Sequence, residues 1–481
     1  MINKKIIYFI LGFLLIIESA FLLLSLIVSL IYGENDSQAF FISFIISLVF
    51  GFGITFFNRK AKKNIGKREG YIIVSLVWVI FSLFGSLPFY LSNAIPNITD
   101  AFFETMSGFT TTGASILNNI EELPHGILFW RSITQWMGGM GMIVMSLAIL
   151  PLLGIGGMQL FVAEVPGPVP DKLHPRVKET AKRLWAIYII FTAAEVVFLM
   201  LGGMNFFDAV NHSLTTMATG GYSTKQSSII NFSPYIQYII TLFMFIAGTN
   251  FTLSYFALHG KVRKVWENEE FRYYLGFVLG FTTLITLSLL VNDSSDIEKS
   301  FRDALFQVVS LITTTGYATA DYLSWGHFCI VLSFMVMFFG GSAGSTGGGI
   351  KIMRIVLLIK NGAMEFKRLV HPNAIIPVRF NKRAVSSQII TNVLAFFVFY
   401  IIMFAFGTVV MAFLGESLDT AMGATIASLG NIGPGIGAVG PMDNFYHLHP
   451  VGKWVLSFLM LVGRLELFTV LILLSPSFWK K

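Results

Sequence analysis

Long apolar stretches, separated by short polar connections, run from the first residues of the chain to the last. A helix needs about 20 apolar residues to cross the hydrocarbon core of a bilayer, and ten stretches come close to that length or exceed it. We therefore predict an all-α polytopic membrane protein with both termini on the same side. The predicted spans are residues 6–32, 39–57, 71–91, 126–153, 184–203, 235–258, 274–291, 327–359, 387–414 and 451–474.

Lysine and arginine are concentrated in the connections on one side of this arrangement. Cytoplasmic connections of membrane proteins carry an excess of these residues, so we expect that side, with both termini, to be cytoplasmic. Among the other basic residues, we assign Arg131 and Lys453 to loops on the opposite side. The clusters cover residues 4–5, 59–68, 172–183, 261–272, 351–383 and 480–481.

The composition agrees with this prediction, since 55% of the 481 residues are hydrophobic, 12% are charged and the mean hydropathy is +0.73. These values exclude an ordinary soluble domain. The formal net charge of +7 is accounted for by basic clusters that anchor the connections on anionic lipid. We therefore predict the lipid bilayer as a partner and no binding of nucleic acid.

Four of the predicted connections on the side opposite the basic clusters share one pattern. Each begins with an aspartate, continues through small or apolar residues and ends at a glycine. Such segments are too short to cross a membrane and too apolar to lie in water, so we predict re-entrant half-helices followed by extended loops that line a wet cavity. The aspartate would cap each half-helix and favour its dipole. The four segments are residues 100–113, 208–221, 303–316 and 419–433.

The ends of these segments have the composition of a carbonyl-lined cation filter. Potassium loses its water when backbone carbonyls replace the hydration shell, and glycine tolerates the backbone angles that a carbonyl ring requires. None of the four ends carries the acidic residues of a divalent-cation filter or the basic residues of an anion pore. We predict potassium as the bound ion, with no organic cofactor, held mainly by the backbone carbonyls of Thr111, Thr112, Gly113, Thr219, Gly220, Gly221, Thr314, Thr315, Gly316, Asn431, Ile432 and Gly433.

The eighth predicted span is interrupted by a glycine-rich run at residues 340–349. Each glycine costs a helix about 1 kcal/mol relative to alanine, so we predict a flexible, non-helical loop that blocks the pore until it moves. A phosphate-binding loop is disfavoured because Lys351 does not directly follow a glycine, whereas a passive kink for helix packing stays open. The predicted gate residues are Gly340, Gly341, Gly344, Gly347, Gly348, Gly349, Lys351 and Arg464.

Arg464 lies within the otherwise apolar last span, where a charge is costly and usually faces a wet cavity or a partner. A position facing the pore below the filter would let Arg464 repel cations and help to close the gate. The alternative is a structural ion pair with an acid on another helix, such as Glu195.

Several segments of the chain resemble the Trk/Ktr/HKT superfamily of potassium transporters, and most closely its TrkH-type membrane subunits of bacteria. The two extra N-terminal helices fit this branch better than the shorter Ktr-type subunits. The matching segments are residues 107–114, 135–141, 175–182, 340–351, 430–435 and 463–466.

The resemblance implies four M1–pore helix–M2 repeats with pseudo-fourfold symmetry around one pore, preceded by two helices. It also implies a homodimer in the bacterial inner membrane and a cytoplasmic ring of nucleotide-binding regulatory subunits as partner. Serine at the first filter glycine goes with sodium permeation in this superfamily, so Gly113 favours potassium. The implied units are residues 1–68 for the N-terminal pair, then 69–160, 172–260, 271–365, with its broken second helix, and 384–475.

We predict, on these grounds, a potassium uptake protein that is not an enzyme. A mixed sodium and potassium pore and a cation-coupled symporter stay open as alternatives. A secondary transporter of small organic solutes is disfavoured, because inverted repeats would place the loops on both sides of the membrane. An intramembrane enzyme would need a paired nucleophile and base at membrane depth, and the sequence offers no such pair.

Overall fold

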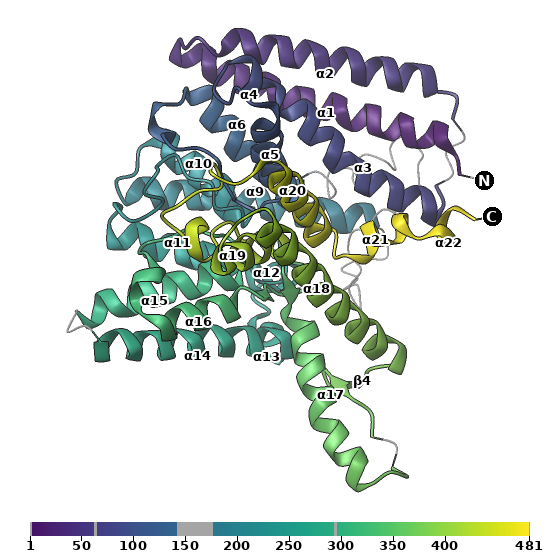
Figure 1. Cartoon of the computed structure of the whole chain (residues 1–481), viewed down its shortest axis with the longest axis vertical. Helices are drawn as coiled ribbons and strands as arrows, with labels where there is room; N and C mark the ends of the chain where they lie inside the picture. The colour runs from purple at the N-terminus through teal and green to yellow at the C-terminus, as the bar shows by residue number, and fades with distance from the viewer. Residues whose placement is uncertain (1, 62–64, 142–176, 293–295, 375, 481) are drawn as a thin grey trace.

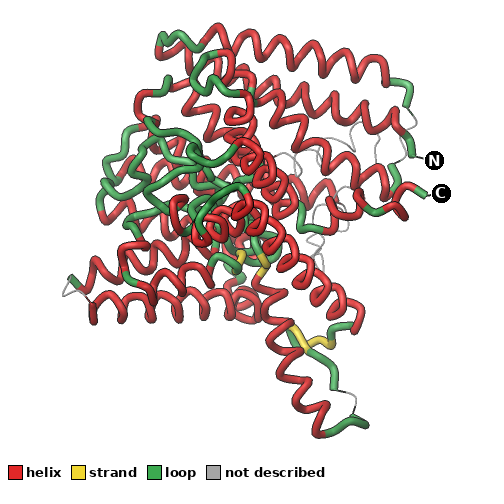
Figure 2. Tube along the Cα trace, in the orientation of Figure 1, coloured by secondary structure: helices red, strands yellow, loops and turns green. Residues whose placement is uncertain are grey.

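A computed structural model describes residues 2–61, 65–141, 177–292, 296–374 and 376–480. Both chain ends lie on one side of the molecule (Figure 1), here called the termini face. Loops gather at the centre and toward the other side (Figure 2), here called the opposite face. Among the described residues, six helices are long and apolar enough to cross a membrane, or up to eight if two bent pairs each count as one span.

The first two helices, α1 (Lys4–Tyr32) and α2 (Ser37–Asn58), form an antiparallel pair along one edge of the molecule (Figure 1). Small residues let the two backbones approach closely, as is common between helices in membranes. An ideal Cβ added to Gly51 would lie 2.9 Å from the carbonyl oxygen of Gly12 and 3.0 Å from the amide nitrogen of Ile16. The contact between α1 and α2 therefore depends on the absence of a side chain at Gly51.

The rest of the chain forms four units, each with a first long helix, a half-helix with a loop, and a second helix. The first unit contains α3 (Lys67–Gly85), α4 (Leu87–Leu91), α5 (Ile98–Phe109), the 3-10 turn η1 (Ile120–Glu122), α6 (His125–Trp136) and the π-turn η2 (Met137–Gly141). The second contains α9 (Val177–Leu201), α10 (Phe206–Met217), α11 (Pro234–Ala247) and α12 (Phe251–Leu258), and α13 (Val262–Glu267) connects it to the third.

The third unit differs because a loop and two short strands replace the middle of its second helix. It contains α14 (Glu269–Asn292), α15 (Ile297–Ile312), η4 (Tyr322–Trp325), α16 (His327–Val336), β1 (Phe339–Gly340), β2 (Ile350–Lys351) and α17 (Ile352–Val370). The fourth contains α18 (Ser387–Phe413), α19 (Leu418–Leu429), η5 (Gly437–Val439), α20 (Pro450–Arg464), α21 (Phe468–Leu474) and α22 (Pro476–Trp479).

One small sheet lies within the third unit, and the other lies in the connection between the third and fourth units. β1 and β2 pair in parallel, with Phe339 opposite Ile350, and so close the ends of the glycine-rich loop. β3 (Arg379–Phe380) and β4 (Arg383–Ala384) form an antiparallel hairpin. Figure 1 shows this hairpin between α17 and α18, where α17 extends away from the rest of the chain.

Within the described residues, the second helix is interrupted in three of the four units. Two spans predicted as continuous are wrong in this respect: α11 and α12 meet at an angle of 110°, and α20 and α21 meet at 119°. The first unit has the π-turn η2 at the corresponding place, and the rest of its predicted span, residues 142–153, lies outside the described residues. The third unit has the glycine-rich loop, as predicted.

The four half-helices α5, α10, α15 and α19 confirm the predicted re-entrant segments, but their caps differ from the prediction. Asp100 and Asp208 lie in the first helical turn, where a carboxylate favours the dipole. The capping side chains are those of residues just before each helix, because only they can reach the unpaired amide groups of the first turn. These caps are Asn97, Asn205, Asp296 and Ser417.

We expect Gly51→Ala to destabilise the N-terminal helix pair by about 1–3 kcal/mol, because the new methyl group overlaps the backbone of α1. Thermal unfolding in detergent, followed by size-exclusion chromatography, measures the loss. Gly53→Ala on the same helix is the matched control, since a Cβ there meets nothing within 4 Å. An equal effect of both substitutions would show that the close approach of α1 and α2 is not limiting.

Candidate functional site

The four half-helices end in short loops, here called the filter loops, which cover residues 110–113, 218–221, 313–316 and 430–433. In each loop the backbone is left-handed at two positions separated by one residue. When left-handed residues alternate with others, the polar atoms of the same kind in successive peptide groups point to one side of the backbone. The φ angles are 54° at Thr111, 52° at Thr219, 60° at Thr314 and 53° at Asn431, and then 82° at Gly113, 76° at Gly221, 84° at Gly316 and 100° at Gly433.

The four glycines lie around a common centre. An ideal Cβ on Gly113 would overlap the carbonyl oxygen of Gly220, one on Gly221 that of Thr315, one on Gly316 that of Ile432, and one on Gly433 that of Thr112. All four separations are below the 3.0 Å that real Cβ atoms keep. Each filter loop thus meets the next in the order of the chain, and the fourth meets the first. The same four glycines line one cavity of about 80 Å³.

Two filter loops depart from fourfold equivalence. The carbonyl oxygen of Gly220 accepts a hydrogen bond of 2.7 Å from Nε2 of Gln135, and Oε1 of Gln135 accepts from the amide of Tyr222 at 3.1 Å. A carbonyl oxygen has two lone pairs, so this contact leaves Gly220 one for another donor or an ion. In the fourth loop, Nδ2 of Asn431 donates to Oγ1 of Thr112 at 3.0 Å, which ties the fourth loop to the first.

A buried ion pair supports the residues that follow the first two filter loops. Nε of Arg131 lies 2.9 Å from Oε1 of Glu104, and the two side chains are 2% and 0% exposed. Glu104 also accepts from the amide of Ile116 at 2.9 Å, while Nη1 of Arg131 donates to the carbonyl of Ser223 at 3.1 Å. The guanidinium lies 4.1 Å from the ring centre of Tyr222, over its face. The pair therefore connects α5, α6 and the residues that follow both loops.

A second buried pair joins α5 to α20. Nζ of Lys453 lies 2.6 Å from Oδ1 of Asp100 and donates to the carbonyl of Tyr446 at 2.8 Å. The assignment of Arg131 and Lys453 to loops is therefore wrong, since both are buried in helices. Their apolar sequence neighbours were the available signal, because a basic residue inside an apolar stretch usually has a partner.

The glycine-rich loop lies against the ends of three half-helices. The amide of Gly348 donates to Oγ1 of Thr314 at 2.7 Å, and Oγ1 of Thr346 donates to the carbonyl of Met217 at 3.1 Å. A Cβ on Gly347 would lie 2.7 Å from the carbonyl oxygen of Thr313, and one on Gly348 would lie 2.5 Å from that of Gly430. The loop thus contacts the second, third and fourth units directly.

Backbone contacts and one carboxylate hold the loop in this position. The amide of Ser342 donates to the carbonyl of Gly248 at 2.8 Å, beside a Gly341 that has no room for a side chain. Oε1 of Glu270, at the start of α14, accepts from the amides of Ala343 at 2.7 Å and Met353 at 3.2 Å. Glu270 therefore binds one residue within the loop and one at the start of α17, which follows it.

Two basic side chains contact the glycine-rich loop, and both donate hydrogen bonds to its backbone carbonyls. Nζ of Lys351, which is buried, donates to the carbonyl of Gly347. Nη1 of Arg464 donates to the carbonyl of Thr346 at 2.6 Å, and its Nη2 donates to the carbonyls of Gly138 and Gly139 at 2.6 and 2.7 Å. Arg464 thereby links the loop to η2 of the first unit, so all four units meet below the filter loops.

The alternative that paired Arg464 with Glu195 does not hold among the described residues, where the guanidinium of Arg464 donates to three backbone carbonyls. Glu195 is instead buried within α9. The remaining predicted gate residues, Gly340, Gly344 and Gly349, lie within or at the ends of the loop, and Gly344 has a left-handed φ of 78°.

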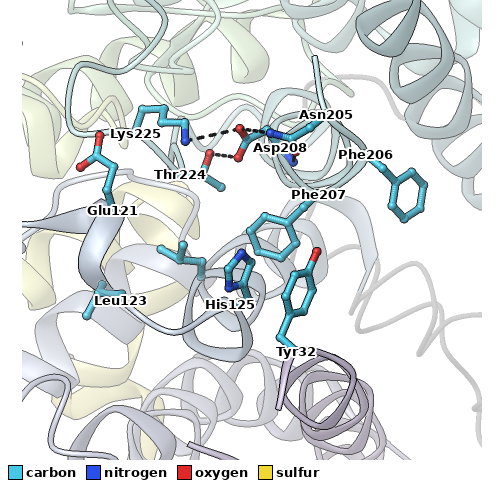
Figure 3. A pocket seen from close by; sticks show the side chains of 11 residues that line it. Tyr32, Glu121, Leu123, His125, Asn205, Phe206, Phe207, Asp208, Thr224 and Lys225 are labelled. Carbon is cyan, nitrogen blue, oxygen red and sulfur yellow. Dashed lines mark hydrogen bonds and ion pairs between the residues drawn. The ribbon is translucent and has the colours of Figure 1, made fainter. Parts of the chain in front are cut away.

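A separate cavity of about 340 Å³ lies beside the start of α10 (Figure 3). Figure 3 shows Lys225 and Thr224 directed at Asp208, with Nζ of Lys225 at 3.5 Å and Oγ1 of Thr224 at 2.6 Å. Burial by itself would raise the pKa of Asp208, but hydrogen bonds from Thr224 and Asn205 and the charge of Lys225 hold that pKa below its ordinary value. Asp208 thus stays ionised at the start of its half-helix.

Comparisons with known proteins point to one family. The family described as "TrkH: Cation transport protein" matches residues 36–481. The chain is 44% identical over 478 residues to the Trk system potassium uptake protein TrkH of Escherichia coli K12, and the match covers 98% of both chains. It is 35% identical to TrkG of the same organism over 98% of this chain and 97% of the relative.

A solved structure agrees with these sequence matches. The crystal structure of the potassium transporter TrkH from Vibrio parahaemolyticus superposes with a TM-score of 0.90 at 40% sequence identity. The alignment covers the whole of both chains. The two relatives from Escherichia coli K12 are both named as potassium uptake proteins.

We expect Arg131→Met to lower the free energy of unfolding by about 3–5 kcal/mol, because it leaves the buried carboxylate of Glu104 without a countercharge. Thermal unfolding in detergent measures this loss. Arg131→Met combined with Glu104→Leu should recover much of the stability, since neither charge then remains buried alone.

Arg263→Met is the matched control, because its ion pair with Glu267 has side chains that are 90% and 57% exposed. Exposed pairs contribute at most about 1 kcal/mol. A loss from Arg131→Met no larger than that of the control would contradict the supporting role of the buried pair.

Proposed function

This chain belongs to the TrkH family of cation transport proteins, and we propose that it takes up potassium ions through a filter of backbone carbonyls. One observation carries the proposal: four glycines from four separate units line one small cavity, each against a carbonyl of the next loop. Backbone oxygens at this spacing can replace the water of a monovalent cation without any charged side chain. The C-terminal ends of the four half-helices add partial negative charge at the same centre.

The ion-holding groups in this proposal are the carbonyls of the filter loops. The middle residues Thr112, Gly220, Thr315 and Ile432 supply the oxygens nearest to the glycines of the adjoining loops. Gly220 contributes less than the others, because Gln135 already uses one side of its carbonyl. Four chemically different loops should therefore prefer potassium over sodium without excluding sodium completely.

We further propose that the termini face is cytoplasmic and that the ion enters from the opposite face. The basic clusters of the sequence support this orientation. A membrane potential that is negative inside favours the inward movement of one positive charge by about 2.3 kcal/mol per 100 mV. Since about 1.36 kcal/mol corresponds to a factor of ten, the potential alone supports roughly 50-fold accumulation per 100 mV.

The glycine-rich loop and Arg464 form the gate in this proposal. The loop contacts the inner ends of three half-helices, and Arg464 joins it to the first unit. In this proposal two basic groups, Lys351 and Arg464, lie where a cation would leave the filter. Opening requires the loop to give up its contacts with Thr314, Gly248 and Glu270.

The partners follow from the family rather than from contacts within this chain. Relatives are named as parts of a Trk system, and we propose that regulatory subunits of that system bind the termini face. A homodimer in the bacterial inner membrane, with one pore in each protomer, completes the proposal.

Uptake of labelled rubidium into proteoliposomes tests the function. Vesicles loaded with potassium and diluted into sodium develop an inside-negative potential only if potassium leaves through the protein. We expect rubidium to accumulate and external potassium to compete with it. Competition by amino acids, with none by potassium, would instead support a transporter of small organic solutes.

We expect Gly113→Ser to raise the permeability of sodium relative to potassium by about tenfold, because a side chain there displaces the carbonyl of Gly220 and costs at least about 1.4 kcal/mol of selectivity. Ratios of rubidium and sodium flux measure the change. Gly203→Ser is the matched control, since Gly203 has a similar φ of 89° but a Cβ there meets nothing within 4 Å. Equal selectivity in wild type and Gly113→Ser would remove Gly113 from the filter.

We expect Arg464→Ala to increase the flux of the closed protein about tenfold or more, since it removes a positive charge and three hydrogen bonds to carbonyls. Arg464→Lys keeps the charge and should retain most of the block. Rubidium flux measured without regulatory subunits compares the three proteins. Unchanged flux in Arg464→Ala would show that this residue does not close the pore.

A further inference from the structure

An apolar groove of about 680 Å³ lies between helices that are far apart in the sequence. Its walls come from α3, α17, α18 and α21, and its lining is dominated by phenylalanine, leucine, isoleucine and valine. Phe399 and Ile472 lie at its rim and are 43% and 37% exposed. The volume falls within the range of pockets that bind small ligands.

The position of the groove exposes it to hydrocarbon rather than to water. The stretches Lys67–Leu91 and Ser387–Phe413, which supply two of its walls, are both long and apolar enough to cross a membrane. Tyr71 and Ile389 lie in the first turns of these stretches, at the ends nearest the basic clusters. The groove therefore belongs to the leaflet on the termini face.

The polar residues of the lining are Tyr71, Asn392 and Arg354, and none is acidic. Oδ1 of Asn392 accepts from Gln388 at 3.1 Å, which leaves the amide nitrogen as its donor toward the groove. The polar part of the groove thus offers hydrogen-bond donors, one of them on the guanidinium of Arg354, whose charge is paired with Glu466. Such a lining complements a ligand that has acceptor oxygens and a negative charge.

Arg354 has an unused donor at this place. Its Nη2 pairs with the carboxylate of Glu466, and its guanidinium lies 4.0 Å from the ring centre of Phe396. Nη1 is buried and has no hydrogen-bond partner among the residues that the structure describes. A buried charged group normally satisfies its donors, so the side chain is equipped for one more acceptor.

We propose that an anionic phospholipid of the cytoplasmic leaflet binds in this groove. One acyl chain lies against Phe396, Phe399 and Phe468, while phosphate or ester oxygens accept from Asn392 and Arg354. A membrane lipid is the occupant because the groove combines a hydrocarbon-facing wall with a donor-rich end that includes the guanidinium of Arg354. A small rotation of the Arg354 guanidinium presents Nη1 to the lipid.

The same contact connects the lipid to the gate, a step that rests on the proposed function. Glu466, the partner of Arg354, is two residues from Arg464, which holds the glycine-rich loop. The rotation of the guanidinium that brings Nη1 to a lipid oxygen draws Nη2 away from Glu466 and loosens the segment between α20 and α21. Anionic lipid therefore favours the open gate.

Photolabelling tests the binding site without reference to transport. Full-length protein in proteoliposomes is labelled with a phosphatidylglycerol that carries a diazirine in one acyl chain, and the labelled peptides are identified by mass spectrometry. We expect labels on α18 and α21, competed by unlabelled phosphatidylglycerol and poorly by phosphatidylcholine. Ile389→Trp, which fills the groove, should reduce this labelling about tenfold, since a bound chain contributes at least about 1.4 kcal/mol there.

Val398→Trp is the matched control, because Val398 lies on α18, is 54% exposed and does not line the groove. Labelling that is equal in wild type, Ile389→Trp and Val398→Trp would overturn the site. A bismaleimide link between two copies at Ile389→Cys would also overturn it, because a second chain would then cover the groove. The native Cys329 is buried and does not interfere.

Rubidium flux tests the link to the gate separately. We expect wild type to conduct faster in vesicles with phosphatidylglycerol than in pure phosphatidylcholine, and Ile389→Trp to lose this difference. Equal flux of wild type in both lipids would overturn the link. No flux in either lipid, with groove labelling intact, would refute the proposed uptake function and leave the lipid site standing.

Discussion

The constraint on which this structure depends is that peptide groups inside a membrane must find partners within the protein. Four loops leave the helical conformation at the centre of the molecule, and their amide and carbonyl groups cannot turn to lipid. Each loop begins where its half-helix ends and lies against the next loop, so the four ends enclose one small polar space. The long helices, the buried ion pairs and the close glycine contacts hold the four loops in position around that space.

The support of the filter loops is uneven, and the unevenness has a chemical basis. The first two loops are held by the buried pair of Glu104 and Arg131, whose charges need each other because neither can be hydrated. The fourth loop is held by the side-chain amide of Asn431, which reaches both Thr112 and the carbonyl of Met460. The third loop accepts a hydrogen bond from the glycine-rich loop at Thr314. It is therefore the filter loop most directly coupled to movement of the glycine-rich loop.

Much of the architecture could be predicted from the sequence, because hydrophobic length and the repeated aspartate-to-glycine segments are local signals. The four glycines were identified because each ends the same pattern, and the glycine-rich run was evident from composition. The bends after Ala247 and Arg464 were not predicted, since apolar sequence continues across both. Arg131 and Lys453 were misplaced because their partners, Glu104 and Asp100, are distant in the chain and only the fold brings them together.

Among the described residues, only the third unit has a long loop within its second helix, and one arginine, Arg464, links that loop to the first unit. In an assembly of four identical subunits, any such residue would appear four times around the axis, and four like charges at close range would repel one another. When the four units are joined in one polypeptide, such a residue can occur in one unit only. Covalent linkage thus gives this architecture a freedom that symmetric tetramers lack: each quarter can be assigned a different task while the centre keeps its shared geometry.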